Sequence, residues 1–382
     1  MSTTYSQEHI DTIRLIRSQH IGPGTFHRLL DRHGTVNNAL RAVPSMATRG
    51  GAKSPVLASE ADILDEITAT TRYGAQIITL LDAEYPSMLR MLDFPPPVLT
   101  VYGNTDLLNT QALAVVGARN ASANGYRFAY HMAKTLGSHL TIVSGLARGI
   151  DTAAHHGALE SGTTIAVTAC GIDQIYPQEN EALYRLIGER GIIVTEMPFG
   201  TPPKSQNFPK RNRIISGLSL GTLVIEAGLK SGSLITAQCA LEQNKEIFAV
   251  PGSPLDHRCH GTNHLLKEGA HLVTSPDDIL AILNGAILQE NYQSQRASST
   301  APPTTIPDAS VMLFETADIL NIHNTILEKL SPSPTDINDI ISQTDLTASH
   351  ILTILLELEL AGKVKRYPGN KIALHAALTS LR

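Results

Sequence analysis

Short apolar runs alternate with amphipathic segments of helix length from about Leu113 to Leu283. The runs are rich in β-branched residues and lie at 113–116, 141–143, 164–167, 192–194, 222–225, 247–250 and 271–273. Nearly continuous apolar character is typical of strands that are buried on both faces of a sheet. The alternation with helices therefore predicts an α/β domain with a doubly wound, mostly parallel sheet. The preceding segment, from about 75 to 110, is expected to begin the same domain.

The region before this domain predicts a small helical domain, and the region after it a linker. Residues from about 6 to 60 contain short helical patterns, and a glycine-rich turn at 22–24 precedes an apolar helix. Such a turn occurs in helix-hairpin-helix and SAM-like elements, where its backbone N–H groups can hold a phosphate, and equally in a plain packing unit. Residues 286–318 are rich in Gln, Ser, Thr, Ala and Pro, which favours a flexible linker.

The C-terminal region has the order of a winged helix. Three helical patterns at 323–330, 334–342 and 347–361 precede a hairpin that turns at 368–370. The third pattern is apolar and acidic, whereas a helix that reads duplex DNA must approach phosphates, so we expect a packing or interaction role. The predicted segments are a helical domain at 1–72, the sheet domain at 73–285, the linker at 286–318 and a winged-helix-like domain at 319–382.

Length, charge, cysteine content and apolar stretches limit the kinds of protein that this chain can be. The length of 382 residues fits two or three domains. A formal net charge of −5 argues against a protein that coats nucleic acid with its whole surface, but permits a focused basic groove. The three cysteines lie far apart, which fits a reducing cytoplasm. No apolar stretch approaches the ~20 residues of a membrane span, and the N-terminus lacks the apolar run of a signal peptide, so we expect a cytoplasmic protein with no membrane partner.

A basic cluster with one aromatic residue lies at 201–213, which contains no acidic residue. Phe208 sits within it, although aromatic residues make up only 4% of the chain. Single-stranded nucleic acid suits such a cluster, because cations follow its phosphates and aromatic rings stack on its bases. The alternative is a solvated loop with Phe208 in the core. The basic residues are Lys204, Lys210, Arg211 and Arg213.

Two glycine-containing loops follow the first two strands predicted in this region. Ligands of open parallel sheets bind beyond the carboxyl ends of the strands. Glycines let backbone N–H groups approach a phosphate, and Arg119 and Arg148 would add positive charge; alternatively, the glycines only make tight turns. Neither GxGxxG nor GxxxxGK[ST] is present, so we expect no cofactor. The loop residues of interest are Gly117, Arg119, Ser144, Gly145, Arg148, Gly149 and Asp151.

The sequence gives little support for a set of catalytic or metal-binding residues. Ser144, Asp151 and the histidine pair at 155–156 could form a triad on paper, but the last three lie on one predicted helix and no GxSxG is present. We expect Asp151, near the start of that helix, to cap or brace the glycine loop. Residues 256–260, DHRCH, match no standard zinc spacing, so no metal is expected.

Six motifs of the sheet domain resemble the DprA/Smf family of DNA-processing proteins. They are VGAR at 116–119, SGLARGIDTAAH at 144–155, NFPKRNRIISGLS at 207–219, EAGLKSGSLITA at 226–237, AVPG at 249–252 and GTNHLLKEGA at 261–270. The resemblance implies an extended Rossmann fold and a homodimer. It also implies binding of single-stranded DNA, protection of incoming DNA and loading of the RecA recombinase during natural transformation, without an established hydrolytic step.

The resemblance further implies which residues contact DNA. The positions that match family contacts are Gly117, Arg119, Ser144, Gly145, Phe208, Arg211 and Asn212. Charge and position add Arg148, Lys204 and Lys210. The residues expected to support the site are Gly149, Asp151, Arg213 and Glu226.

An enzymatic alternative rests on residues 217–226. The sequence GLSLGTLVIE resembles the GGxGTxxE motif of lysine-decarboxylase-like nucleotide hydrolases, Rossmann-type enzymes that cleave nucleoside monophosphates. Glu226 would then be catalytic. The chain departs from the motif, because Leu218 and Ser219 interrupt the double glycine and one extra residue precedes Glu226. The basic segment around Phe208 favours a polymer over a mononucleotide.

Overall fold

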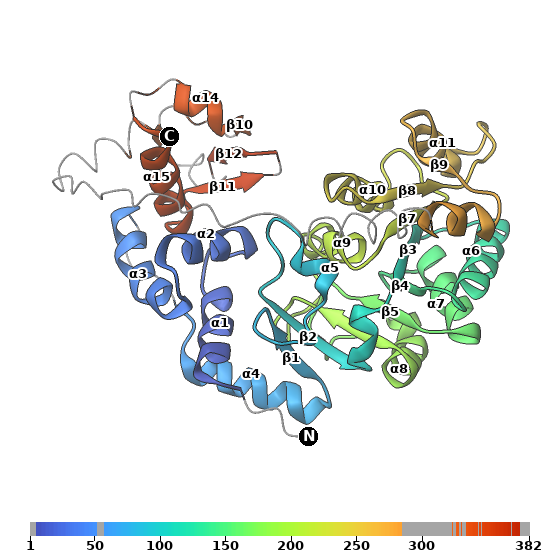
Figure 1. Cartoon of the computed structure of the whole chain (residues 1–382), viewed down its shortest axis with the longest axis horizontal. Helices are drawn as coiled ribbons and strands as arrows, with labels where there is room; N and C mark the ends of the chain where they lie inside the picture. The colour runs from blue at the N-terminus through green and yellow to red at the C-terminus, as the bar shows by residue number, and fades with distance from the viewer. Residues whose placement is uncertain are drawn as a thin grey trace, which may run out of the picture. The chain divides into compact units, whose positions relative to one another are not determined.

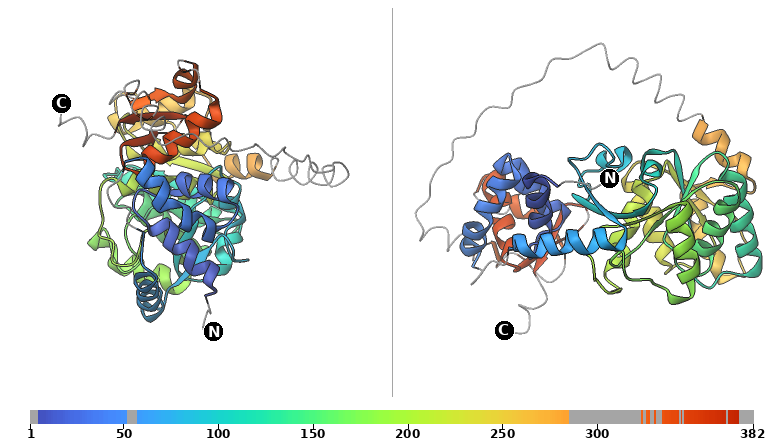
Figure 2. Two further views of the ribbon diagram at one scale, coloured as in Figure 1. Left: turned by 90° about the vertical axis from the view of Figure 1, so that its left-hand side faces the viewer. Right: turned by 90° about the horizontal axis from the view of Figure 1, so that it is seen from below.

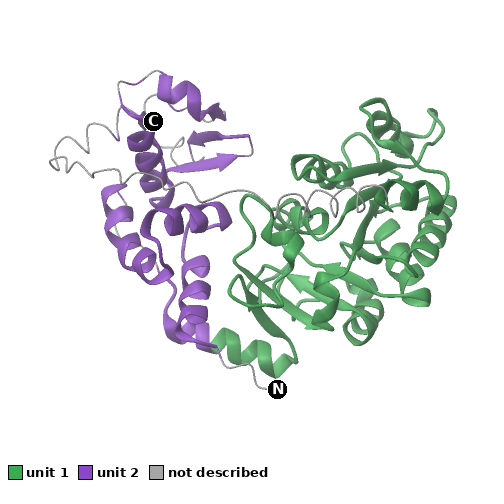
Figure 3. Cartoon of the chain, in the orientation of Figure 1, with its two compact units in different colours: residues 1, 65–301 green, residues 2–64, 302–382 purple. Residues whose placement is uncertain are grey.

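The computed structural model describes residues 5–51, 57–284 and, from 323 onward, 323, 326–327, 330, 334–342, 344, 346–367 and 369–374. These residues form two compact units (Figure 3). The sheet unit falls within 65–301, and the winged-helix unit combines residues within 2–64 with residues within 302–382. The predicted linker at 286–318 lies outside the described residues.

The sheet unit is built on one nine-stranded sheet, in the order β1-β2-β6-β5-β4-β3-β7-β8-β9. The strands are β1 (Gln76–Thr79), β2 (Val98–Gly103), β3 (Ala112–Gly117), β4 (Thr141–Ser144), β5 (Thr164–Val167), β6 (Ile192–Thr195), β7 (Gly221–Ile225), β8 (Glu246–Ala249) and β9 (His271–Leu272). All pairs from β6 to β9 are parallel, which confirms the predicted doubly wound α/β sheet. The segment expected only as an extension adds β1 and β2, which pair antiparallel at the edge.

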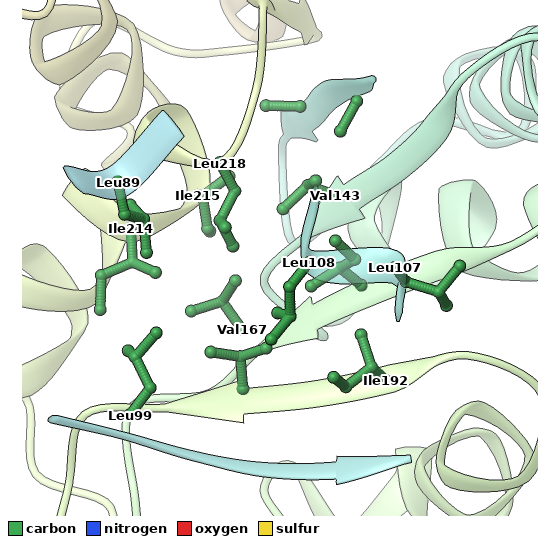
Figure 4. Close-up of a cluster of buried hydrophobic side chains, with 14 of the residues drawn as sticks. Leu89, Leu99, Leu107, Leu108, Val143, Val167, Ile192, Ile214, Ile215 and Leu218 are labelled. Carbon is green, nitrogen blue, oxygen red and sulfur yellow. The ribbon is translucent and has the colours of Figure 1, made fainter. Parts of the chain in front are cut away.

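Helices cover both faces of this sheet (Figures 1 and 2). Successive side chains of β3 alternate between the two faces: Leu113 and Val115 pack with α6 and α7, whereas Ala114 and Val116 join the core beneath α9 and α10. Ile214, Ile215 and Leu218 of the α9 region close that second core (Figure 4). The helices and 3-10 turns of the unit are α5 (Ser87–Arg90), η1 (Thr105–Asn109), α6 (Ala123–Leu136), α7 (Ile150–Ser161), η2 (Gln178–Asn180), α8 (Glu181–Arg190), α9 (Asn207–Gly217), α10 (Gly232–Glu242), η3 (His257–Cys259) and α11 (His260–Lys267).

The strand order reverses at β3. The strands β4, β5 and β6 follow on one side of it, and β7, β8 and β9 lie on the other. The loops that leave the carboxyl ends of β3 and β7 therefore lead to helices on opposite faces of the sheet, α6 and α10. Such a switch point leaves a crevice between the two loops, where open α/β sheets bind their ligands.

The winged-helix unit contains both of the smaller domains that the sequence predicts. Its N-terminal helices are α1 (Gln7–Arg17), α2 (Pro23–His33) and α3 (Val36–Arg49), and α4 (Glu60–Tyr73) continues from it into the sheet unit. The C-terminal elements are β10 (Thr335–Asp336), α14 (Ile337–Ser342), α15 (Ala348–Leu360), β11 (Val364–Tyr367) and β12 (Lys371–Leu374). The strands β11 and β12 form the expected hairpin, and β10 adds a third strand by pairing with β12.

Helix α15, the third helix of the predicted winged helix, packs against α3. Its Glu357 is buried and accepts hydrogen bonds from Arg49 Nε at 2.9 Å and from His323 Nε2 at 3.0 Å. Glu359 pairs with Arg28 at 2.8 Å. The acidic side chains Glu357 and Glu359 of α15 are thus paired with basic side chains of the same unit. No helix in the described part of the chain is long and apolar enough to cross a membrane.

Candidate nucleic-acid interface

A cavity of about 510 Å³ opens at the switch point of the sheet. The loop after β3 (117–120) forms one wall, and the loop into α10 (228–233) forms another. One face of α9, the residues Ala147 and Asp151, and the pair His257 and Arg258 also contribute to the lining. Segments from both sides of the strand reversal thus meet at one site, as the topology requires.

The segment 207–217 is a helix, α9, so the solvated loop that the sequence left open as an alternative does not form. Pro209 lies in its first turn, where a backbone N–H has no acceptor within the helix, so proline is tolerated. The helical period then places Phe208, Arg211, Asn212 and Ile215 on one face, and all four line the cavity. Lys210, on another face of the helix, and Lys204, before it, are exposed and do not line the cavity.

Arg211 is the central cation of the cavity. Only 5% of its surface is exposed, and its Nε has no hydrogen-bond partner among the described residues. Burial lowers the pKa of Arg211 to about 10, and the Asp151 carboxylate opposes this effect, so the guanidinium stays charged at neutral pH. Gly145 makes room for it, because a Cβ at this position would lie 1.4 Å from Arg211 Nη1.

Phe208 lines the cavity and lies close to two guanidinium groups. The Cζ atoms of Arg119 and Arg211 lie 5.3 Å and 5.9 Å from its ring centroid, within the range of cation–π attraction. Phe208 is partly exposed and Arg119 is exposed. The predicted alternative of a phenylalanine buried in the core therefore does not apply.

The loop after β4 is held from beneath by Asp151 of α7. The buried Oδ2 of Asp151 accepts hydrogen bonds from the backbone N–H groups of Gly145 at 3.2 Å and Ala147 at 3.3 Å. Burial raises the pKa of Asp151, and the nearby Arg211 opposes this shift. The carboxylate thus braces the glycine loop and supplies a countercharge on the inner side of Arg211.

Three residues of the predicted site are fixed by close packing in the loops, namely Gly117, Ser144 and Gly149. Ser144 has no exposed surface, and its Oγ donates to the Val115 carbonyl at 2.6 Å. A Cβ on Gly117 would lie 1.9 Å from the Ile225 carbonyl, and Gly149 has a φ of 76° with no room for a Cβ beside Ala118. Here the reading of these glycines as close-packed turns accounts for their positions.

Of the remaining predicted residues, Arg148 lies outside the cavity lining, whereas Asn212 and Arg213 bond to neighbouring segments. Arg148 is exposed and pairs with Glu179 at 2.8 Å, outside the cavity lining. Asn212 donates to the Gly232 carbonyl at 3.2 Å and so joins α9 to the start of α10. Arg213 forms an ion pair with Glu196 beneath the helix.

Glu226, the residue that the enzymatic alternative requires, is engaged at the start of α6. Its carboxylate accepts from the backbone N–H of Ser122 at 2.8 Å and from the Ser122 hydroxyl. The same carboxylate fills the space beside Gly125. These contacts give Glu226 a supporting role and tie the loops after β3 and β7 together.

Sequence reasoning missed two side chains at this site. Arg258 lines the cavity from η3, and Tyr176 contacts Phe208 with ring centroids 5.6 Å apart. The scarcity of aromatic residues could have drawn attention to Tyr176, which sits in a proline-bounded loop after β5. The described residues contain no group of three or more His, Cys, Asp and Glu side chains that could hold a metal ion.

Three family profiles match successive parts of the chain. A profile for DNA recombination-mediator protein A matches residues 76–284. Profiles for a DprA-like N-terminal HHH domain and a DprA winged helix domain match residues 6–69 and 316–370. Protein Smf of Escherichia coli (strain K12) is 39% identical over 308 residues, which cover 78% of this chain and 77% of that protein.

Two solved structures are similar to more than half of the chain. DNA processing protein A from Streptococcus pneumoniae matches with a TM-score of 0.64 and 36% identity, over 73% of this chain and 98% of that one. DNA processing protein A from Helicobacter pylori, whose structure describes its single-stranded DNA binding mode, matches with a TM-score of 0.50 and 30% identity, over 56% and 97%. With one profile spanning over half of the chain and a relative covered over 77% of its length, the chain belongs to the DprA/Smf family.

Proposed function

We propose that this protein binds single-stranded DNA at the cavity between the loops after β3 and β7. The observation that carries the proposal is Arg211, a buried cation whose Nε has no hydrogen-bond partner among the described residues. A buried donor without an acceptor is costly, and a phosphate oxygen would satisfy it with a charge-assisted hydrogen bond. The Helicobacter pylori relative, known for binding single-stranded DNA, supports this choice of ligand.

Different side chains of this site would bind the bases and the phosphates. Phe208 offers a partly exposed ring for stacking a base, while Arg211 and Arg119 neutralise the adjacent phosphates. The exposed Lys204, Lys210 and Arg148 would meet the strand only outside the cavity. A focused site of this kind is consistent with a formal net charge of −5 for the whole chain.

Within the cell, we propose that the protein is a non-catalytic mediator of recombination. It would protect incoming single-stranded DNA and load RecA onto it in natural transformation, acting as a homodimer in the cytoplasm. Membership of the DprA/Smf family and the match to a recombination-mediator profile support this role. The engagement of Glu226 by Ser122 supports a function without hydrolysis.

The proposal is tested by measuring the affinity for single-stranded and duplex oligonucleotides of one sequence across a salt series. We expect tighter binding of the single strand and an affinity that falls as salt rises, because phosphate contacts release counterions. Replacing Arg211 with Ala should weaken single-strand binding and lower the slope of log affinity against log salt by about one unit. Equal affinity for both forms of DNA, or a slope that Arg211→Ala leaves unchanged, would contradict the proposal.

A further inference from the structure

Tyr176 is an exposed aromatic residue placed directly beside Phe208. Its side chain belongs to the loop after β5 and is 42% exposed. The two ring centroids lie 5.6 Å apart, and the ring planes are inclined by 59°. Tyr176 does not line the cavity itself, so the aromatic surface continues beyond the cavity rim toward the β5 side of the sheet.

The environment of Tyr176 differs from that of the tyrosines that serve the core. Tyr85 and Tyr184 are almost fully buried, and each hydroxyl donates to a backbone carbonyl, of Pro96 and Ile172 respectively. Buried tyrosines normally satisfy their hydroxyl in this way. The structure gives the Tyr176 hydroxyl no hydrogen-bond partner within the described residues, and 42% of the residue is exposed. Core packing therefore does not account for this side chain.

The loop that carries Tyr176 is fixed in place by the neighbouring glycine loop. Asn180 Nδ2 donates to the Leu146 carbonyl at 2.9 Å, and Thr152 also contacts Asn180. Glu179 of the same segment pairs with the exposed Arg148. The segment that follows Tyr176 is thus anchored to the glycine loop, and its Glu179 joins it to Arg148, a cation outside the cavity.

We propose that Tyr176 is a second base-stacking residue, which extends the DNA site by one nucleotide from Phe208 toward Arg148. The inference rests on the proposed binding of single-stranded DNA. Rings inclined by 59° with centroids 5.6 Å apart leave no space for a base between them, so successive bases would stack on separate rings. Part of the Phe208 ring is covered by Arg119 and Arg211, whereas the described residues place no cation over Tyr176.

The test compares Tyr176→Leu and Tyr176→Phe in the full chain, with oligothymidylate as the probe. Loss of one stacked base should weaken single-strand binding about 5- to 100-fold in Tyr176→Leu. Tyr176→Phe, which keeps the ring, should restore the affinity to within about twofold of the wild type. The salt dependence should be unchanged in both, because no charge is removed. Tyr126→Leu is the matched control, since Tyr126 is 37% exposed in the same unit but, within the described residues, has no ring contact with Phe208.

A second measurement needs no variant and so does not depend on folding. Oligothymidylates with 5-iododeoxyuridine at single positions are cross-linked to the wild-type protein by light, and the modified residues are mapped by mass spectrometry. We expect Phe208 and Tyr176 to react with adjacent nucleotides. Cross-links to Phe208 alone, with wild-type affinity in Tyr176→Leu, would overturn the role of Tyr176 and leave the proposed function standing. Equal affinity of the wild-type protein for single-stranded and duplex DNA would overturn the proposed function and, with it, the role of Tyr176.

Discussion

The Arg211 guanidinium fits in its place because residue 145 is a glycine. The guanidinium occupies the position that a Cβ at Gly145 would take, 1.4 Å from Nη1. Backbone strain is not the reason for this glycine, since its φ lies outside the left-handed region. Gly145 is therefore a glycine because of a side chain that comes from a distant helix, and substituting it should act on the cation.

We expect Gly145→Ala to displace Arg211 and to weaken single-strand binding by about 1.5–3 kcal/mol, the usual contribution of a hydrogen bond to a charged group. Arg211→Ala should have a similar effect, and the double variant should lose no more than either single variant, because both changes remove the same interaction. Fluorescence anisotropy titrations of all three variants give the comparison. Additive losses would show that Gly145 has a separate role in binding.

The second prediction at this scale concerns Phe208. We expect Phe208→Ala to weaken binding of single-stranded DNA by ~1–3 kcal/mol, as removal of a stacking ring does elsewhere. The slope against salt should stay unchanged, in contrast to Arg211→Ala, because phenylalanine carries no charge. Isothermal titration at several salt concentrations measures both quantities. A Phe208→Ala protein with wild-type affinity would exclude stacking on this ring.

At the scale of elements, the helical period of α9 and α15 determines which of their charged side chains reach a partner. In α9 the helical period directs Phe208, Arg211 and Asn212 toward the cavity and leaves Lys210 exposed. In α15 the period directs Glu357 into the packed face, where Arg49 and His323 surround its carboxylate. Sequence composition alone treats the basic or acidic residues of each segment as equivalent, although only some of them reach a partner.

The carboxylate of Glu357 makes the winged-helix unit sensitive to acid. Burial raises its pKa, but hydrogen bonds from His323 and Arg49 outweigh burial and hold the pKa below its usual value. A group with a lowered pKa in the folded state stabilises the fold above its unfolded pKa, and this contribution is lost as the pH falls through the folded value.

We therefore expect hydrogen-exchange protection of α15 to fall as the pH drops below about 4.5, the ordinary range of a glutamate. In Glu357→Gln the same helix should show weaker protection at neutral pH and a smaller additional loss in acid. The strands β3 to β7 of the sheet unit serve as the internal reference. Identical pH profiles for α15 in the two proteins would mean that Glu357 does not couple this helix to protonation.

At the scale of the whole molecule, the proposed DNA site belongs to one unit and the winged helix to the other. Every residue that lines the cavity lies in the sheet unit. The acidic face of α15 is engaged by Arg28 and Arg49 within its own unit. We expect Glu357→Gln to keep wild-type affinity for single-stranded DNA and to gain no affinity for duplex DNA, in parallel titrations. Altered single-strand affinity in this variant would place the winged-helix unit in the binding reaction.

The sequence alone determined the class of fold and the end of the sheet at which we propose the DNA site. Buried β-branched runs are a local property, and a parallel sheet brings the carboxyl ends of its strands to one edge wherever helices intervene. The family motifs also lie in the sequence itself, so membership of the DprA/Smf family was predicted and then confirmed.

Only the tertiary structure decided which residues are available at that edge. Ser144 and Arg211 both belong to family motifs. Ser144 is buried and its hydroxyl donates to a carbonyl of β3, whereas Arg211 lines the cavity. Tyr176 contacts Phe208 because the loop after β5 and the start of α9 meet in space. Such contacts between distant segments depend on how the helices cover the sheet. They therefore cannot be predicted from the periodicity of a single segment.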